Sequence, residues 1–184
     1  MSVKTTVPLF PLVLLLAAVS ALPALRAADI EDSKEVSDLL AQAKTEAIQL
    51  KNDATDMESF TLSPNLSWQS HAAKITEIKE HVNALGKTIA KLEQKKSTAS
   101  PWQRTAIERI NPVLRELAAN TTSIIDHLNK EQGRLLHTQE HKDYLKANAQ
   151  LASNMTEVVS DFVDYGQTKD RFEKLSRKLE IAER

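Results

Sequence analysis

Residues 101–136, PWQRTAIERINPVLRELAANTTSIIDHLNKEQGRLL, form the stretch that decides the fold. Serine at the N-cap (Ser100), proline at the first helical position (Pro101) and glutamine at the third (Gln103) are a strong helix start signal. Apolar side chains then recur every three or four residues, which predicts one long amphipathic helix over residues 101–136. Its apolar line comprises Ile107, Ile110, Leu114, Leu117, Thr121, Ile124, Leu128 and Leu135, interrupted by Glu131.

Pro112 lies about three turns into this helix. Proline removes one backbone hydrogen bond and crowds the carbonyl of the residue four positions earlier, here Glu108. The apolar line keeps its register across Pro112, so we expect a kink rather than an end of the helix. Two separate helices are the alternative.

A polar stretch, Asn120-Thr121-Thr122-Ser123, interrupts the apolar face in the middle of the helix. In an antiparallel arrangement, Asn148 and Asn83 of neighbouring helices lie at similar depth. Two interpretations are open: a small polar cavity that binds a ligand, or a buried polar layer that fixes the register of the helices.

Two helices are predicted before this stretch, over residues 32–60 and 66–96, with a turn at residues 63–65. Asp32 and Glu35 have the spacing of an N-cap and its capping partner. Both segments show alternating steps of three and four between apolar positions, as in a coiled coil. The first line is Val36, Leu40, Ala43, Ala47, Leu50, Ala54 and Met57, and the second is Trp68, His71, Ile75, Ile78, Val82, Leu85, Ile89 and Leu92.

A fourth helix is predicted over residues 138–182, with Thr138 as its N-cap. Gly166 weakens it locally, by about 1 kcal/mol relative to alanine. Its last turns are highly charged, with a thin apolar line through Phe172, Leu175 and Leu179. The heptad line runs through Tyr144, Asn148, Leu151, Met155, Val158, Phe162, Tyr165, Lys169, Phe172, Ser176 and Leu179.

Four helices with short connections predict an all-α fold, an antiparallel up-down-up-down four-helix bundle with left-handed, coiled-coil-like packing. Residues 28–184 form its single domain. At about 1.5 Å per residue the first two helices are about 45 Å long and the last about 65 Å, so the C-terminal helix is expected to overhang the bundle. The chain has three glycines and 4% aromatic residues, which argues against a β-sandwich or barrel.

Residues 1–27 resemble a signal peptide: Lys4 is followed by an apolar run over residues 8–22 and by small residues, with cleavage after Ala27 or Ala28. An uncleaved anchor helix is the alternative. The segment carries two basic residues and no acid, which leaves 22 basic and 25 acidic residues and a net charge of −3. This near-neutral charge gives no indication of the basic surface that nucleic-acid-binding proteins have. An exported chain without cysteine favours a bacterial periplasmic or secreted protein that has no stable membrane anchor once the signal is cleaved.

Three of the five histidines are expected at one end of the bundle: His71, His137 and His141. Three imidazoles are candidate ligands for zinc, copper or nickel. His81 and His127 are expected on the flank or surface. No motif for a nucleophile, a phosphate-binding loop or a zinc protease occurs, and no cofactor is indicated.

The sequence therefore predicts a non-enzymatic, exported helical bundle with a structural or protein-interaction role. Phe172, Leu175 and Leu179 of the overhang are the candidate interaction residues, for a partner helix or for another copy of the chain. The alternative is a bundle that binds a metal ion or a small ligand.

Overall fold

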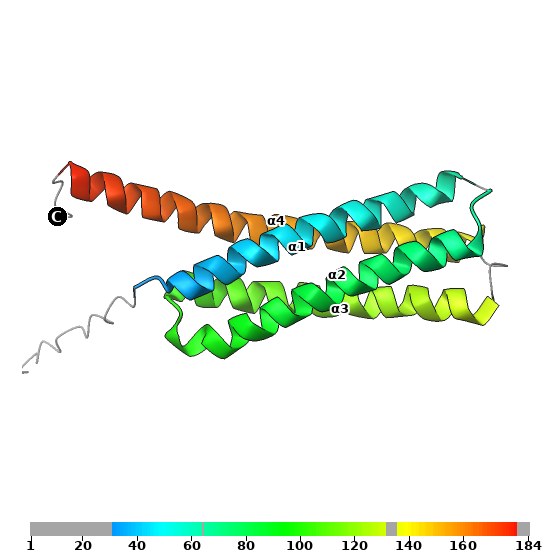
Figure 1. Cartoon of the computed structure of the whole chain (residues 1–184), viewed down its shortest axis with the longest axis horizontal. Coiled ribbons are helices and arrows are strands. Elements are labelled where there is room, and N and C mark those ends of the chain that lie inside the picture. The colour runs from blue at the N-terminus through cyan, green and yellow to red at the C-terminus, as the bar shows by residue number, and fades with distance from the viewer. Residues whose placement is uncertain (1–30, 64, 132–135, 180–184) are drawn as a thin grey trace, which may run out of the picture.

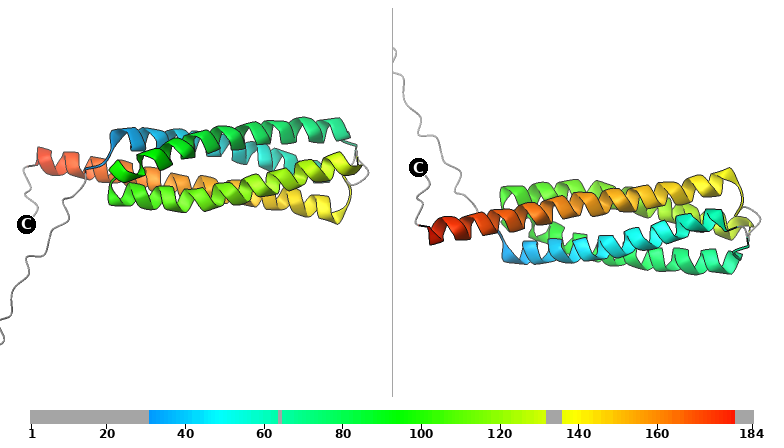
Figure 2. Two further views of the ribbon diagram at one scale, coloured as in Figure 1. Left: turned by 90° about the horizontal axis from the view of Figure 1, so that it is seen from below. Right: turned by 90° about the horizontal axis from the view of Figure 1, so that it is seen from above.

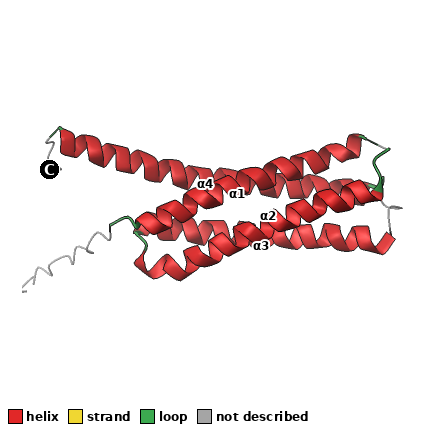
Figure 3. Ribbon diagram, viewed as in Figure 1, coloured by secondary structure: helices red, strands yellow, loops and turns green. Residues whose placement is uncertain are grey.

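A computed structural model describes residues 31–63, 65–131 and 136–179. The proposed signal peptide lies outside the described residues. The described residues form four long helices, α1 (Lys34–Ser59), α2 (Trp68–Lys95), α3 (Pro101–Glu131) and α4 (Gln139–Lys178), with short 3₁₀ turns η1 (Phe60–Leu62) and η2 (Lys96–Thr98). Figure 3 shows that helices make up the whole framework of this part of the chain.

The helices pack as an up-down four-helix bundle, as predicted (Figure 1). Each helix packs against the next one in the chain, and α1 packs against α4 to close the bundle. Figure 2 shows that α4 continues beyond the other helices at the end of the bundle where α1 begins. None of the described helices is long and apolar enough to span a membrane.

The apolar lines of the first three helices were predicted correctly. Every position predicted for α1 is buried, and so is every described position predicted for α3, while Leu135 lies outside the described residues. In α2 the line from His71 to Leu92 is buried and Trp68 is half-buried. The helix α3 is continuous through Pro112, so the alternative of two separate helices is wrong.

The predicted core line of α4 is only partly right. Asn148 and Met155 are buried, but Tyr144, Leu151, Val158 and Phe162 are half-buried and Tyr165 is exposed. Successive residues of an α-helix are rotated by about 100° around its axis. These half-buried side chains therefore lie on the flank of α4, next to the face that packs on the core. The residues that face the core are His141, Leu145, Asn148, Ala149, Ala152, Met155, Val159 and Val163.

The starts of α1, α2 and α4 are capped by small hydroxyl side chains. Thr138 caps α4 as predicted, since its side chain accepts a hydrogen bond from the backbone N–H of His141. Asp32 was predicted to cap α1, but Ser33 does so, by accepting from the N–H of Val36. Asp32 is held elsewhere because Trp102 Nε1 donates to its Oδ1 at 2.6 Å and Lys169 Nζ donates to its Oδ2 at 2.9 Å.

Gln103 and Trp102 join three helices at this end of the bundle. The buried Gln103 side chain accepts from the N–H of Ser100, as expected for its capping position, and also from the N–H of Ser33. Trp102 packs so closely on Gly166 of α4 that an added Cβ would lie 2.7 Å from the indole ring. Glycine at this position is therefore required by the packing of α3 on α4.

Candidate functional site

The C-terminal part of α4, here called the projecting segment (residues 167–179), is the first candidate site. Lys169 pairs with Asp32, the residue just before the N-cap of α1, at 2.9 Å. This pairing holds the base of the segment at the start of α1. Beyond it, α4 continues to Lys178 past the ends of the other described helices (Figure 2).

The projecting segment exposes large apolar side chains. Phe172 is 60% exposed, Leu175 50% and Leu179 62%. With Thr168 they follow steps of four, three and four, so they lie on one face of the helix, here called the apolar seam (Thr168, Phe172, Leu175, Leu179). The structure therefore leaves the three predicted interaction residues open to contact.

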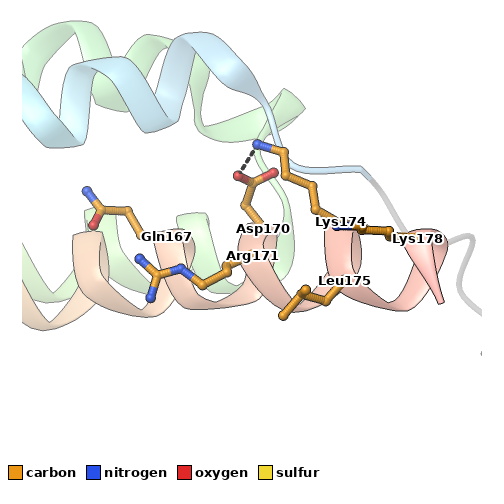
Figure 4. A pocket seen from close by; sticks show the side chains of 6 residues that line it. All are labelled: Gln167, Asp170, Arg171, Lys174, Leu175 and Lys178. Carbon is orange, nitrogen blue, oxygen red and sulfur yellow. Dashed lines mark hydrogen bonds and ion pairs between the residues drawn. The ribbon is translucent and has the colours of Figure 1, made fainter.

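Basic side chains border the apolar seam. In heptad terms Phe172 and Leu175 occupy positions a and d, which places Arg171 and Lys178 at position g and Lys169 and Ser176 at position e. Arg171 and Lys178 are exposed, and neither makes an ion pair within the described residues. They also line, with Gln167, Asp170, Lys174 and Leu175, a shallow hollow on this helix alone (Figure 4).

The two acids of the segment are already paired with lysines of the same helix. Asp170 pairs with Lys174 and Glu173 pairs with Lys169, each at 2.6 Å. The hydrogen bonds to Glu173 and then to Asp32 raise the pKa of Lys169, so this lysine stays charged. Burial alone would raise the pKa of Asp32, but the hydrogen bonds it accepts outweigh burial and lower it. The free charge next to the apolar seam is therefore basic.

The second candidate site is a histidine cluster (His71, His127, His141) at the opposite end of the bundle. Its members come from α2, α3 and α4, and at most 8% of any of them is exposed. His141 Nε2 and His71 Nδ1 lie 3.2 Å apart, and the rings of His127 and His141 stack with centroids 5.4 Å apart. Aromatic rings pack edge-on around the cluster, with Phe60 against His71 and Tyr144 against His127.

The membership of this cluster differs from the prediction. His71 and His141 come together as expected, whereas His137 is exposed in the turn before α4. The prediction that His127 lies on the flank or surface is wrong, because His127 follows Ile124 by three residues and so shares its buried face. His81 is partly exposed and lies 3.1 Å from a carboxylate oxygen of Asp53.

Burial sets the charge of the cluster. Burial lowers the pKa of His141 to about 4, and the neighbouring His71 and His127 act in the same direction. Burial also lowers the pKa of His71, with a further contribution from His137. Both rings are therefore neutral near pH 7. Two ring nitrogens, His141 Nδ1 and His127 Nε2, are buried without a hydrogen-bond partner.

Within the described part of the chain, no group of three or more histidine, aspartate or glutamate side chains is arranged to hold a metal ion. The cluster has two ring nitrogens that are close together and two others without partners. Its geometry is that of a buried aromatic cluster in which burial lowers the pKa of His71 and of His141.

The polar residues in the middle of α3 bond to one another across the α3–α4 contact. Asn148 Nδ2 donates to Asn120 Oδ1 at 3.1 Å and to Thr121 Oγ1 at 3.0 Å. Asn83, which was expected at this depth, is exposed and takes no part. The hydroxyls of Thr122 and Ser123 bond to their own helix. These contacts favour the polar layer over a ligand cavity.

The comparisons with known proteins leave the identity of the chain open. No protein-family model matches it, and no curated protein and no solved structure does either.

Proposed function

We propose that this protein is a non-enzymatic, exported interaction module that binds another protein through its projecting segment. The observation that carries the proposal is the exposed apolar face formed by Phe172, Leu175 and Leu179 beyond the end of the bundle. Exposed apolar side chains at heptad spacing on a helix are the surface that a partner helix buries.

The way the segment is supported also favours binding. Trp102 packs on Gly166, and Lys169 joins Asp32 to Glu173 at the base of the segment. A helix that is anchored and formed before binding loses less conformational entropy on association than a disordered peptide. The bundle in this proposal is the support that presents a short, rigid helical surface.

Site-specific photocrosslinking in the source cells tests this function. A photoreactive phenylalanine analogue replaces Leu175 or, as the control, Leu62, which is 83% exposed and lies at the opposite end of the bundle. We expect one discrete adduct from position 175 and none from position 62. The adduct should disappear when Phe172→Glu is added and persist when Leu62→Glu is added instead. Equal products from both positions would refute the proposal.

The second candidate function is binding of a metal ion, for which the histidine cluster offers one close pair of ring nitrogens and not a set of three ligands. Its support is the 3.2 Å approach of His71 Nδ1 and His141 Nε2, which is close to the separation of two nitrogen ligands of one tetrahedral zinc ion, roughly 3.3 Å. Elemental analysis of untagged protein decides between the candidates. Stoichiometric metal that is lost in His141→Leu and kept in His81→Gln supports this candidate, and metal-free protein eliminates it.

A further inference from the structure

The charges beside the apolar seam restrict what can pack on it. A helix that packs on Phe172, Leu175 and Leu179 places its own edge positions next to Arg171 and Lys178. Both are exposed and lack an ion pair within the described residues, and the two acids of the segment are paired with lysines of their own helix. The surface offered to a partner is therefore an apolar strip with one basic edge, formed by Arg171 and Lys178, that has no ion pair within the described residues.

We propose that the partner of the projecting segment is an amphipathic helix of a different protein, with acidic residues along the edge of its apolar stripe that meets Arg171 and Lys178. This inference rests on the proposed function and names the chemistry of the partner. Acidic side chains opposite Arg171 and Lys178 convert two unpaired charges into ion pairs across the interface. The same pairs select against helices with basic or neutral edges.

A second copy of this chain is the occupant that the charges disfavour. In an antiparallel pair of identical helices, position g faces position g of the other copy, so Arg171 and Lys178 meet basic residues. In a parallel pair position g faces the position e that follows it by five residues, so Arg171 faces Ser176, while the position opposite Lys178 lies outside the described residues. Within residues 167–179, neither orientation places an acid opposite Arg171 or Lys178.

A membrane surface is disfavoured by the narrow apolar face. The seam has three large apolar side chains, and Asp170 and Glu173 lie on the same two turns as the basic residues. Helices that lie in a membrane interface present a wide apolar face together with a basic polar face. Binding to an anionic vesicle is an outcome that the experiment must be able to detect.

A charge-reversed copy of the protein serves as the probe. The full-length variant Arg171→Glu/Lys178→Glu keeps the apolar seam and supplies acidic edges. Sedimentation velocity is recorded for the wild type, for the variant and for an equimolar mixture, each at low and high salt. We expect both single samples to be monomers and the mixture to form a heterodimer, with association at least about tenfold tighter than in either single sample. High salt should weaken the heterodimer.

Control variants assign the contact to the apolar seam. Phe172→Ser in both members of the mixture should abolish the heterodimer, whereas Leu62→Ser in both should leave it intact. Wild-type self-association that Phe172→Ser removes would overturn the acidic-partner inference and leave the proposed function standing, with a second copy as the occupant. A mixture that stays monomeric, or a heterodimer that survives Phe172→Ser, would also overturn the inference.

The remaining outcome concerns lipid. Vesicles of phosphatidylserine and phosphatidylcholine are sedimented with the wild type and with Arg171→Glu/Lys178→Glu. The acidic-helix inference predicts that neither protein cosediments. Cosedimentation of the wild type alone, together with a monomeric mixture, would assign the segment to an anionic membrane surface and would refute the proposed protein partner as well.

Discussion

Mild acid should destabilise this bundle, because His71 and His141 are buried in their neutral form. The pKa of His141 is about 4 in the folded chain and 6.5 in an ordinary environment. As the pH falls through 6.5, the unfolded state takes up a proton at this position that the folded state does not. Folding stability is therefore lost progressively between pH 6.5 and about 4, and above pH 7 the effect vanishes.

The size of the effect follows from the two pKa values. Each pKa unit corresponds to about 1.4 kcal/mol, so the full loss from His141 is about 3 kcal/mol, of which about 2 kcal/mol is lost by pH 5. His71, whose pKa is also lowered by burial, adds a loss of the same sign. The lowered pKa of Asp32 contributes stability that is lost only as the pH falls below about 3.8, outside this window.

Urea unfolding followed by circular dichroism between pH 7.5 and pH 5 measures the loss. The variant His141→Leu removes the titrating ring, and we expect it to lose about 2 kcal/mol less than the wild type over this range. The comparison uses the pH dependence because the variant also leaves His71 Nδ1 without its partner. Leu62→Ser, which changes an exposed side chain and removes no titrating group, should keep the wild-type pH dependence. Equal losses in the wild type and His141→Leu would refute the reasoning.

Two further sets of substitutions test contacts between the helices. Gly166→Ala should lower the free energy of unfolding by about 1–2 kcal/mol, because its Cβ would displace the indole of Trp102. Gly86→Ala, whose Cβ would lie 3.9 Å from the nearest side chain, should raise the free energy of unfolding by about 0.5–1 kcal/mol. Urea unfolding that finds Gly166→Ala more stable than Gly86→Ala would contradict the packing argument. Asn148→Ala should cost about 1–3 kcal/mol because Thr121 loses its buried partner, and the double variant Asn148→Leu/Thr121→Val should recover most of this loss. If the double variant is also less cooperative in unfolding, the polar layer contributes to a unique register.

Periodicity predicted the first three helices well because each has a single apolar face. In α1 every predicted position is buried, since apolar residues recur at alternating steps of four and three along one face of the helix. The start of α3 could also be predicted from the sequence, because the two residues that form the cap are only three positions apart. The side chain of Gln103 accepts a hydrogen bond from the backbone N–H of Ser100. Local signals sufficed where the partners are close in sequence.

Long-range partners explain most of the errors. Asp32 has the correct spacing to cap α1, but Trp102 and Lys169, far away in the sequence, bind its carboxylate. From the sequence, Gly166 is expected only to weaken the helix. The reason for a glycine there is the indole ring of Trp102, which leaves too little space for a Cβ atom. His127 could have been predicted, because the heptad spacing from Ile124 already places it on the buried face.

The error in α4 bears directly on the candidate site. The residues that face the core include His141, Asn148 and two alanines, so they look less apolar than the neighbouring flank. On that flank one line has a spacing of seven residues: Tyr144, Leu151, Val158, Tyr165, Phe172 and Leu179. In a straight helix a strict seven-residue line drifts by about 20° per repeat. The line therefore stays off the core face of α4; it is half-buried at Tyr144, beside the bundle, and exposed at Phe172.

This line of side chains connects the fold to the proposed contact. Within the bundle the line packs partly on α3, as the contacts of Tyr144 with His127 and of Tyr165 with Trp102 show. Past Pro101, where α3 begins, no described helix lies beside this line. The line continues for two more turns through Phe172 and Leu179. A partner helix placed there would take over the role that α3 has along the bundle. Substitutions at Val158 should therefore affect folding, whereas substitutions at Phe172 should affect binding and leave stability nearly unchanged.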